Sequence, residues 1–223
     1  MLSFIENIGL ILQRYGAVFA QGLWNTLWLS FVSVFLGTFL GILVALGKLS
    51  RHKLLMGVVS TYIEIIRGTP ILLQLYFFWL ALPKILPSIS DTTCILSALV
   101  VNASAYIAEV IRAGIQAVDA GQREASLSLG MTERAIMTKV IFPQAIKNIL
   151  PALGNEVIVM IKQTSLASVF FFGELMTAYK QVQSTTFLAL EPLTISGLIY
   201  LFLTVTLSRI TRHFEKRMTQ NER

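Results

Sequence analysis

Several charged and polar side chains lie inside long apolar stretches of this chain, where they could bind a polar ligand or brace neighbouring helices. Asn102, Tyr106 and Glu109 are spaced by four and three residues, which places them on one face of a helix. Lipid cannot satisfy such a polar stripe, so the stripe faces either a partner helix or a pathway through the protein. A second polar group lies further along the chain and comprises Asn155, Glu156, Lys162, Thr164 and Ser165.

The residue types favour binding over catalysis. The sequence has no His–Asp–Ser set, no His-x-x-x-His motif and no pair of cysteines, since Cys94 stands alone and His52 and His213 lie far apart. A disulfide framework and a cysteine-based zinc site are therefore excluded. The stretch 41–48 is not a phosphate-binding loop, because its spacing is wrong and Leu49 replaces the required Ser or Thr. We expect no metal, no cofactor and no enzymatic activity in this chain.

The elements that position these residues are predicted to be membrane spans. Hydrophobic residues make up 55% of the chain, charged residues only 13%, and the mean hydropathy is +0.70. A soluble core of this length could not bury so much apolar surface. Five stretches approach the roughly 20 apolar residues that cross a bilayer, and they run over about 21–47, 56–83, 93–113, 148–173 and 187–208. We predict an all-α integral membrane protein with five transmembrane helices in a single domain, 1–223.

The uneven distribution of basic residues predicts the orientation of these spans. Basic residues follow the first span, surround the central loop and crowd the C-terminal tail, whereas the opposite loops carry only Arg14, Lys84 and Lys180. The positive-inside rule then places the N-terminus outside and both the central loop and the C-terminus in the cytoplasm. The net charge of +6 is therefore a signal of topology and does not indicate nucleic-acid binding. Residues 1–16 lack a basic signal-peptide start and suit a helix on the outer membrane interface.

Small residues form a stripe along the first predicted span. Ser33, Gly37, Gly41 and Ala45 are each four residues apart, so they lie on one helix face where another helix can approach closely. That other helix could belong to the same subunit or to a second one.

The central loop contains the longest hydrophilic passage of the sequence, residues 121–130. Ala125, Leu127 and Leu129 alternate there with charged and amide residues, so one side can dock on a partner while the other meets water. Gly130 is expected to turn the chain, and a second helix then runs to Pro143. An ordered amphipathic segment at the membrane surface, over residues 119–143, indicates contact with another protein.

The spacing in this loop resembles the sequence by which ABC importer permeases dock on their ATPases. The resemblance lies in an acidic–Ala–small triplet, a glycine and a closing proline motif: Glu124, Ala125, Ser126, Gly130, Val140, Phe142 and Pro143. Arg123, directly before the triplet, is also predicted to contact the ATPase. The chain departs from the pattern at Ser126, where Ala is usual, and at Phe142, where Leu is usual. The alternative is an ordinary amphipathic cytoplasmic loop.

A second motif resembles the signature of the polar amino acid subfamily of these permeases, and it consists of Glu64, Arg67, Gly68, Thr69 and Pro70. Glu64 and Arg67 are three residues apart and could pair on one helix face. Gly68 and Pro70 break the helix, and the freed backbone groups must be buried in protein or line a wet cavity. The motif either lines the pathway or, as a structural ion pair, braces the break. The segments 106–114 and 162–166 are also similar to the subfamily.

The resemblance implies a type I ABC importer fold in a bacterial inner membrane. Two permease subunits, of this chain or of this chain and a paralogue, would surround one pathway above an ATPase dimer that binds the ATP. An extracytoplasmic binding protein would deliver an amino acid, and membrane lipid would surround the assembly. The ammonium of a zwitterionic substrate needs acceptors, for which Glu109, Glu156 and Asn155 are candidates. Its carboxylate needs donors, for which Lys162, Thr164 and Ser165 are candidates, and Asn102 and Tyr106 would line the same site. The alternative is that these residues brace the fold.

Two other functions compete with this interpretation. Ion-driven secondary amino acid transporters often show two related halves with broken helices, and this sequence shows no internal repeat. A membrane enzyme or assembly factor would need a catalytic constellation, which the sequence lacks.

Overall fold

A computed structural model of the protein describes residues 2–50 and 52–220, and every regular element within these ranges is a helix. In chain order the elements are α1 (Leu2–Lys48), α2 (Lys53–Gly68), α3 (Ile71–Ile85), α4 (Asp91–Gln116), α5 (Ala120–Ser128), α6 (Glu133–Ile136), the π-helix η1 (Met137–Ile141), α7 (Phe142–Gln163), the 3-10 helix η2 (Thr164–Phe170), α8 (Leu175–Thr186) and α9 (Leu190–Gln220).

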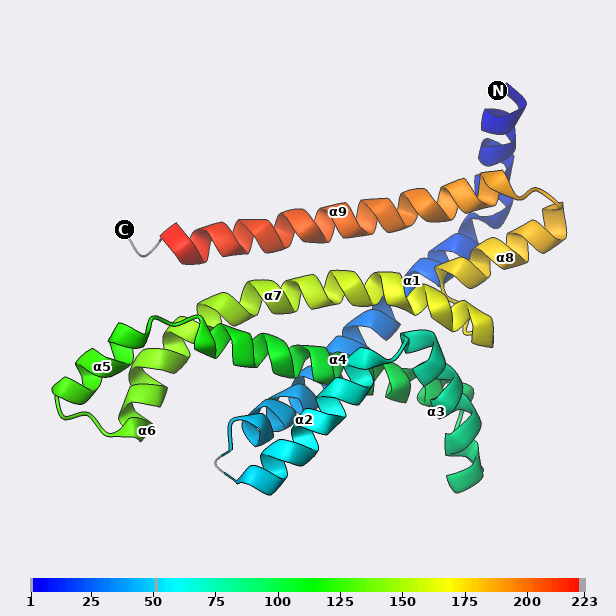
Figure 1. Ribbon diagram of the computed structural model, residues 1–223. Helices are drawn as coiled ribbons and strands as arrows, with labels where there is room; N and C mark the ends of the chain where they lie inside the picture. The colour runs from blue at the N-terminus through cyan, green and yellow to red at the C-terminus, as the bar shows by residue number, and fades with distance from the viewer. Residues whose placement is uncertain (1, 51, 221–223) are drawn as a thin grey trace.

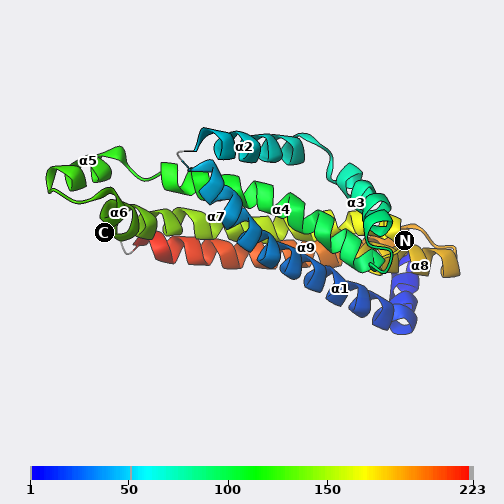
Figure 2. The same ribbon diagram turned by 90° about the horizontal axis from the view of Figure 1, so that it is seen from below.

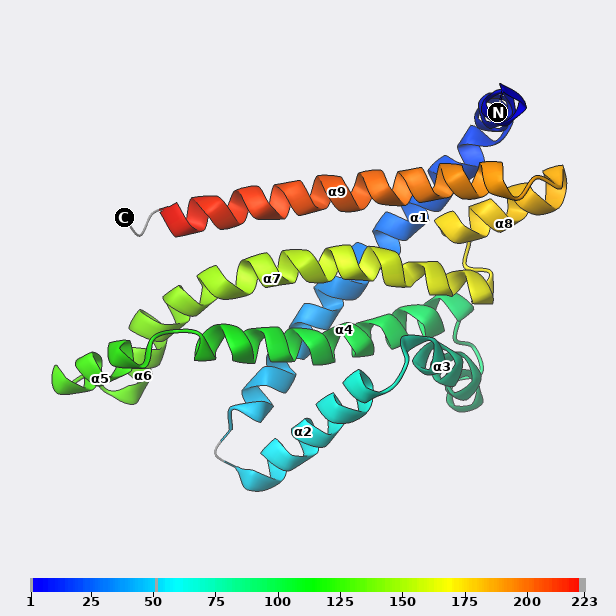
Figure 3. The same ribbon diagram turned by 45° about the horizontal axis from the view of Figure 1, so that its top comes forward.

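Three of the long helices lie roughly alongside one another, and the fourth crosses them. Figure 1 shows α4, α7 and α9 side by side with α1 passing obliquely behind, and the turned views of Figures 2 and 3 preserve this arrangement. The N-terminus lies at one end of the molecule, while α5, α6 and the end of α9 lie at the other (Figure 1). The central loop and the C-terminal tail therefore share an end, as the distribution of basic residues requires.

Helix α4 is the centre of the packing, since it contacts α1, α2, α3 and α7. Ser90 caps its N-terminus by accepting a hydrogen bond from the Thr93 amide at 3.2 Å. Apolar and small side chains then recur along the helix, and several are fully buried in the main core cluster, including Ile95, Ala98, Leu99 and Ile107. Close packing of these side chains stabilises the arrangement of α1, α4 and α7 through van der Waals contacts between the helices.

The small-residue stripe of the first span packs within the subunit. A Cβ on Gly37 would lie 2.6 Å from the Ala103 Cβ, and one on Gly41 would lie 2.9 Å from a methyl carbon of Ile107. Both positions are therefore closed to any larger residue, because α1 and α4 are in backbone contact there. The small residues therefore pack against another helix of the same chain, which was one of the two alternatives that the sequence left open.

The predicted second span is broken where the sequence places Gly68 and Pro70. Helices α2 and α3 meet at an angle of 108° across this break. Within the described ranges, α1, α4 and α9 are long and apolar enough to cross a membrane, and the number rises to five if each of two bent pairs makes one span. The five-span count therefore stays a prediction.

The predicted fourth span differs from expectation at both ends. Its helix begins earlier, at Phe142, and its last turns form the 3-10 helix η2. A further helix, α8, occupies much of the segment predicted to be a loop between the fourth and fifth spans, and it is bent by 46° from the preceding helix. At the other end of the chain, α1 continues without a break from Leu2 to Lys48, so residues 2–16 are continuous with the first span. The position of these residues on the outer membrane interface stays a prediction.

Candidate functional site

The coupling segment, defined here as residues 119–143, begins with a helix whose two ends are both capped. Asp119 accepts a hydrogen bond from the Gly121 amide at 2.8 Å at the start of α5. The helix ends at Gly130, which has a φ of 75°. The amides of Gly130 and Met131 bond the carbonyls of Leu127 and Ser126, at 2.9 and 3.1 Å, which is the Schellman pattern of helix termination. The turn predicted at Gly130 is confirmed.

Side-chain contacts hold α5 against the elements that follow it. Arg123 forms an ion pair with Glu133 on α6, and the Gln144 amide on α7 donates to the Gln122 side chain at 3.5 Å. Ser126, at the position where ABC permeases usually have Ala, is only 5% exposed and donates its hydroxyl to the Gln122 carbonyl at 2.7 Å. The small hydroxyl is therefore satisfied within its own helix, and the departure from the usual residue is structurally harmless.

The outer side of the coupling segment has no partner among the described residues of this chain. Leu129 is 81% exposed and Leu127 is 43% exposed. The Glu124 side chain is exposed and makes no hydrogen bond or ion pair with any residue in the described part of the chain. Ala125 and Pro143 are exposed as well. An ordered helix that presents two leucines and a free carboxylate to solvent fits a docking surface for another protein.

After Pro143 the chain stays helical. The structure continues from α6 through the π-helix η1 into α7, and Pro143 lies in the first turn of α7. Proline is tolerated there because it directly follows the π-helix, where the Phe142 amide bonds the Met137 carbonyl and the ordinary α-helical ladder is already interrupted. The helix that was predicted to end at Pro143 is therefore joined to the fourth span, so that movement of α5 and α6 would be transmitted directly to α7.

The second candidate site is a charged cluster on α4 and on α2 and α7, the two helices that contact it there. Arg112 donates three hydrogen bonds of 2.8–3.2 Å to the two carboxylate oxygens of Glu109, and its other nitrogen bonds Gln116. Arg67 on α2 lies 3.5 Å from the same carboxylate and 5.3 Å from the centre of the Tyr106 ring. The charge of Arg67 also acts on Glu156 of α7. Arg67 therefore forms an ion pair with Glu109 of α4 and is within electrostatic range of Glu156 on α7.

The ion pair expected between Glu64 and Arg67 does not form among the residues that the structure describes. Glu64 is exposed, and the Arg67 guanidinium extends to Glu109 instead. The spacing of three residues permits the local pair, but the last turn of α2 packs against α4, where a carboxylate is within reach. The tertiary contact therefore replaces the local one.

Asn102 belongs to a network that braces the break between α2 and α3. Its side-chain amide donates to the Gln74 oxygen at 2.9 Å. Gln74 in turn donates to the Ile66 carbonyl at 2.7 Å and to the Thr69 hydroxyl at 2.9 Å. The groups freed by Gly68 and Pro70 are thus satisfied by one buried glutamine. The polar face of α4 meets partner helices along this part of its length.

The remaining predicted site residues lie apart from the charged cluster. Asn155 lines a cavity between α7 and α9 together with Asn148, Thr211 and Arg212. The Thr164 and Ser165 hydroxyls donate to the carbonyls of Ile161 and Lys162, both at 2.7 Å, and Lys162 itself is exposed. The structure therefore brings together Tyr106, Glu109, Glu156 and Arg67, but it does not gather the other members around them.

Sequence reasoning did not single out a polar cluster at the other end of the molecule. Glu174 is fully buried and accepts hydrogen bonds from the Met176 and Thr177 amides, at 2.6 and 2.8 Å, and from the Tyr200 hydroxyl at 3.0 Å. It caps α8 and joins it to α9. The signal that could have revealed it is an acidic residue directly after Gly173 and three before Thr177.

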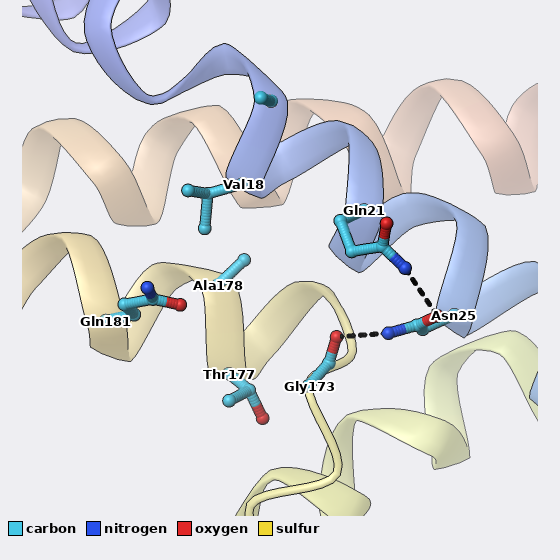
Figure 4. Close-up of a pocket in the computed structure, with 8 residues that line it drawn as sticks. Val18, Gln21, Asn25, Gly173, Thr177, Ala178 and Gln181 are labelled. Atoms are coloured by element: carbon cyan, nitrogen blue, oxygen red, sulfur yellow. Dashed lines mark hydrogen bonds between the residues drawn. The ribbon is translucent and has the colours of Figure 1, made fainter.

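Beside this cluster a polar pocket of about 400 Å³ lies between the N-terminal half of α1 and α8 (Figure 4). Gln21 donates to the Asn25 side chain at 3.1 Å, and Asn25 donates to the Gly173 carbonyl at 2.9 Å, as the dashed lines in Figure 4 show. These bonds hold the turn before α8 on the side of α1. No group of three or more potential metal ligands occurs in the parts of the chain described.

Comparison with known proteins relates these features to a family. Residues 37–220 match the family described as "Binding-protein-dependent transport system inner membrane component". The chain is 37% identical over 203 residues to the arginine transport system permease protein ArtQ of Bacillus subtilis (strain 168), covering 91% of this chain and 93% of that protein. It is 35% identical over 200 residues to the glutamine transport system permease protein GlnP of Escherichia coli (strain K12), covering 89% and 91%.

Solved structures agree with this relationship. A crystal structure described as an amino acid ABC transporter with histidines has 48% sequence identity and a TM-score of 0.90, covering 93% of this chain and 97% of that chain. An inward-facing structure of the MetNI methionine ABC transporter, 21% identical, shares the fold with a TM-score of 0.77 over 90% of this chain and 96% of that chain. The chain therefore belongs to the family of binding-protein-dependent transport system inner membrane components, the non-catalytic permease subunits of ABC transporters in which a separate ATPase hydrolyses ATP.

Proposed function

We propose that this chain is the permease subunit of an ATP-driven importer of polar amino acids in a bacterial inner membrane. It crosses the membrane five times, with its N-terminus outside and the coupling segment and C-terminus in the cytoplasm. It forms the pathway together with a second permease subunit, takes its substrate from an extracytoplasmic binding protein and docks on an ATPase dimer. The observation that carries the proposal is the coupling segment, which is rigid at both ends of α5 and presents Glu124, Leu127 and Leu129 to solvent.

The mechanical connection follows from the continuity of the helices. ATP closes the ATPase dimer, α5 moves with it, and α6, η1 and α7 transmit the movement to the charged cluster. ATP must bind one conformation of the assembly more tightly than the other, since otherwise it shifts no equilibrium. The pathway turns outward when the ATPases close and returns inward after hydrolysis.

Within the charged cluster, Glu156 and Arg67 are the best-placed groups for a zwitterionic amino acid. The Glu156 carboxylate makes no hydrogen bond or ion pair within the described residues, whereas Arg112 occupies both oxygens of Glu109. The Arg67 side chain is 43% exposed, so its guanidinium can donate to a new partner. We assign the substrate ammonium to Glu156 and its carboxylate to Arg67, with Tyr106 and Glu109 holding Arg67 in place. Direct roles for Asn102, Asn155, Lys162, Thr164 and Ser165 have weaker support, because these residues lie apart from Glu156 or bond the protein itself.

The first test is ATP hydrolysis by this chain in nanodiscs, assembled with its ATPase, its second permease subunit if there is one, and the candidate binding protein. We expect one polar amino acid, added with its binding protein, to stimulate hydrolysis. Failure of this chain to form any complex with the ATPase would overturn the role of the coupling segment. A stable complex whose hydrolysis ignores every amino acid would overturn the substrate class only.

The substrate site is tested by Glu156→Gln, which keeps the shape of the side chain and removes its charge. We expect half-maximal stimulation to require at least about tenfold more substrate, as loss of one charged contact implies. Asn155→Ala is the matched control, because Asn155 is the adjacent residue and lines the cavity toward α9. Equal substrate dependence in the two variants would assign Glu156 a structural role.

Family membership argues against the ion-driven secondary transporter. Vesicles that contain only this chain are expected to take up no amino acid when an ion gradient is imposed. Uptake under these conditions, without an ATPase, would restore that alternative.

A further inference from the structure

The buried apolar side chains of the described residues form two larger clusters, and the chain passes from one to the other between η2 and α8. The first cluster, which we call the α4 core, joins the middle of α1 to α3, α4, α7 and η2, and its buried members include Leu29, Leu75, Leu99, Met160 and Phe170. The second, which we call the α8 core, joins the N-terminal half of α1 to α8 and α9 through Ile11, Phe19, Leu175, Ala178, Val182 and Ile195. Helix α7 with its extension η2 therefore packs in one core, and α8 packs in the other.

Residues 171–173 connect the two cores, and their backbone is irregular. Phe171 has a φ of 56° and Gly173 a φ of 78°, so two of these three residues adopt left-handed conformations. The left-handed conformation is unfavourable for phenylalanine, and the Phe171 side chain gains no burial from it, because it is 87% exposed. Conformations of this kind are concentrated at functional positions, and a 3-10 turn such as η2 often marks a hinge. The helix axis bends by 46° across the break.

The α8 side of this break is bonded to α1 and α9. Asn25 of α1 donates to the Gly173 carbonyl at 2.9 Å, as Figure 4 shows. The Leu175 amide donates to the Thr26 hydroxyl of α1 at 3.1 Å, and the Glu174 carboxylate joins the same turn to α9. Thr26, Glu174 and Leu175 are all fully buried, where a hydrogen bond is stronger than in water. Any shift of the start of α8 relative to α1 must therefore break buried hydrogen bonds.

The other side of the break belongs to α7, which η2 continues directly. The Phe170 ring at the end of η2 packs against Tyr76 and Trp79 of α3, with ring centres 4.9 and 5.5 Å apart. Lys180 of α8 reaches back across the break, and its ammonium donates to the carbonyl and the hydroxyl of Ser168 at 3.2 and 3.1 Å. The Lys180 side chain is exposed, so water can replace this contact when the two sides separate.

We propose that residues 171–173 form a hinge, about which α7 and η2 turn as one rod while α8 stays fixed to α1 and α9. A hinge needs only a few residues that absorb a change in φ and ψ, and the ends of two helices supply them here. The inference rests on the proposed function for its driving force, because the coupling segment is joined to the opposite end of α7. A rod that is held at one end and moved at the other turns, so Glu156 on α7 changes its position relative to Arg67 on α2.

The test measures the rate of cross-linking between paired cysteines in the complete complex with the ATPase, in nanodiscs, after Cys94→Ala has removed the native thiol. The hinge pair, Ser168→Cys with Lys180→Cys, spans the break, and removal of the exposed Lys180 side chain opens the approach to position 168. The control pair, Gln21→Cys with Gln181→Cys, joins α1 to α8 across the pocket of Figure 4. A short bifunctional thiol reagent is added to the ATP-free complex and to the complex trapped with ATP and vanadate. Mass spectrometry distinguishes links within one chain from links between two.

We expect the cross-linking rate of the hinge pair to differ at least about tenfold between the two states, because a turn of α7 carries position 168 beyond the reach of a short linker in one of them. The control pair should react at the same rate in both states. Equal rates for the hinge pair would overturn the proposal. A change in the control pair would also overturn it, because α8 would then not be fixed to α1.

The cross-linked complexes give a second readout, which is ATP hydrolysis relative to the same complex before cross-linking. A link across the hinge should slow hydrolysis at least about tenfold, because closure of the ATPase dimer requires α7 to turn. A link between the control positions should leave hydrolysis unchanged. Unchanged hydrolysis with the hinge pair linked would overturn the hinge and leave the proposed function standing. A chain that forms no complex with the ATPase would instead overturn the proposed function, and with it the inference that depends on it.

Discussion

The coupling segment and the charged cluster are held together in different ways. The coupling segment is stabilised mainly within 26 consecutive residues, from the Asp119 cap to Gln144, by turn hydrogen bonds and one ion pair. The charged cluster joins Arg67, Glu109 and Glu156, which come from three helices distant in the sequence. The contacts of the coupling segment are therefore local in the sequence, whereas those of the charged cluster require α4 to pack against other helices.

This difference suggests a division of labour. A segment that transmits force should keep its shape while it moves, and locally bonded helices do so. A pathway that opens and closes needs contacts that break when helices separate, and the ion pair of 3.5 Å between α2 and α4 is of that kind. Four substitutions test whether the two regions differ in this way.

The largest effect is expected for Glu109→Ala. Two partly exposed guanidinium groups lose their carboxylate, and solvent screens part of this loss, so the free energy of unfolding should fall by about 2 kcal/mol. Thermal unfolding of the purified complex measures the change. Glu64→Ala is the matched control, because Glu64 is an exposed carboxylate in the same motif as Arg67. Equal destabilisation by the two variants would show that the cluster is not a stabilising unit.

Glu124→Arg should weaken docking without affecting the fold. The substituted side chain is exposed and has no partner in the described chain, so membrane insertion and thermal unfolding should be unchanged. We expect affinity for the ATPase to fall by about thirtyfold, as reversal of an interface charge implies. Co-purification and ATPase stimulation measure the loss. Glu6→Arg, an exposed reversal at the opposite end of the molecule, should have no effect, and wild-type docking of Glu124→Arg would refute the coupling surface.

Gln74→Ala should destabilise the break between α2 and α3. The substitution leaves the Asn102 amide and the Ile66 carbonyl without their partner. We therefore expect the free energy of unfolding to fall by about 1.5 kcal/mol. Leu73→Ala, at an adjacent position that is 58% exposed, is the control. Unfolding measurements should separate the two variants. If they lose the same stability, the break is braced by something other than the buried glutamine.

The smallest effect is expected for Gly130→Ala. A Cβ at Gly130 would meet no atom within 4 Å, so the substitution introduces no clash. The positive φ alone disfavours alanine there, by a conformational free energy of about 1 kcal/mol. We expect a modest loss of ATPase affinity and little change in the unfolding of the whole chain. Gly57→Ala, at an open position inside α2, should not weaken docking at all. Normal docking by Gly130→Ala would show that ATPase binding does not depend on the left-handed backbone conformation at this turn.

The two regions also differ in how far they could be predicted from the sequence. The turn at Gly130, the break at Gly68–Pro70 and the packing potential of Gly37 and Gly41 were all predicted, and the structure contains each of them. The partner of Arg67 was predicted incorrectly, because helical spacing favours Glu64 while the nearby α4 offers Glu109. Helix α8 was missed because its N-terminal cap, Glu174, is completed by Tyr200 from a later helix.

The sequence alone was enough to predict an apolar, helical protein, the break at Gly68–Pro70 and the turn at Gly130 in the coupling segment. These features depend on periodicity, on glycine and proline, and on hydrogen bonds between residues close along the chain. The packing of the helices was needed to show that Gln74 satisfies the break, and that Arg112 occupies Glu109 while Glu156 has no such partner among the described residues. These outcomes depend on which helices meet and in what orientation, and no local preference contains that information.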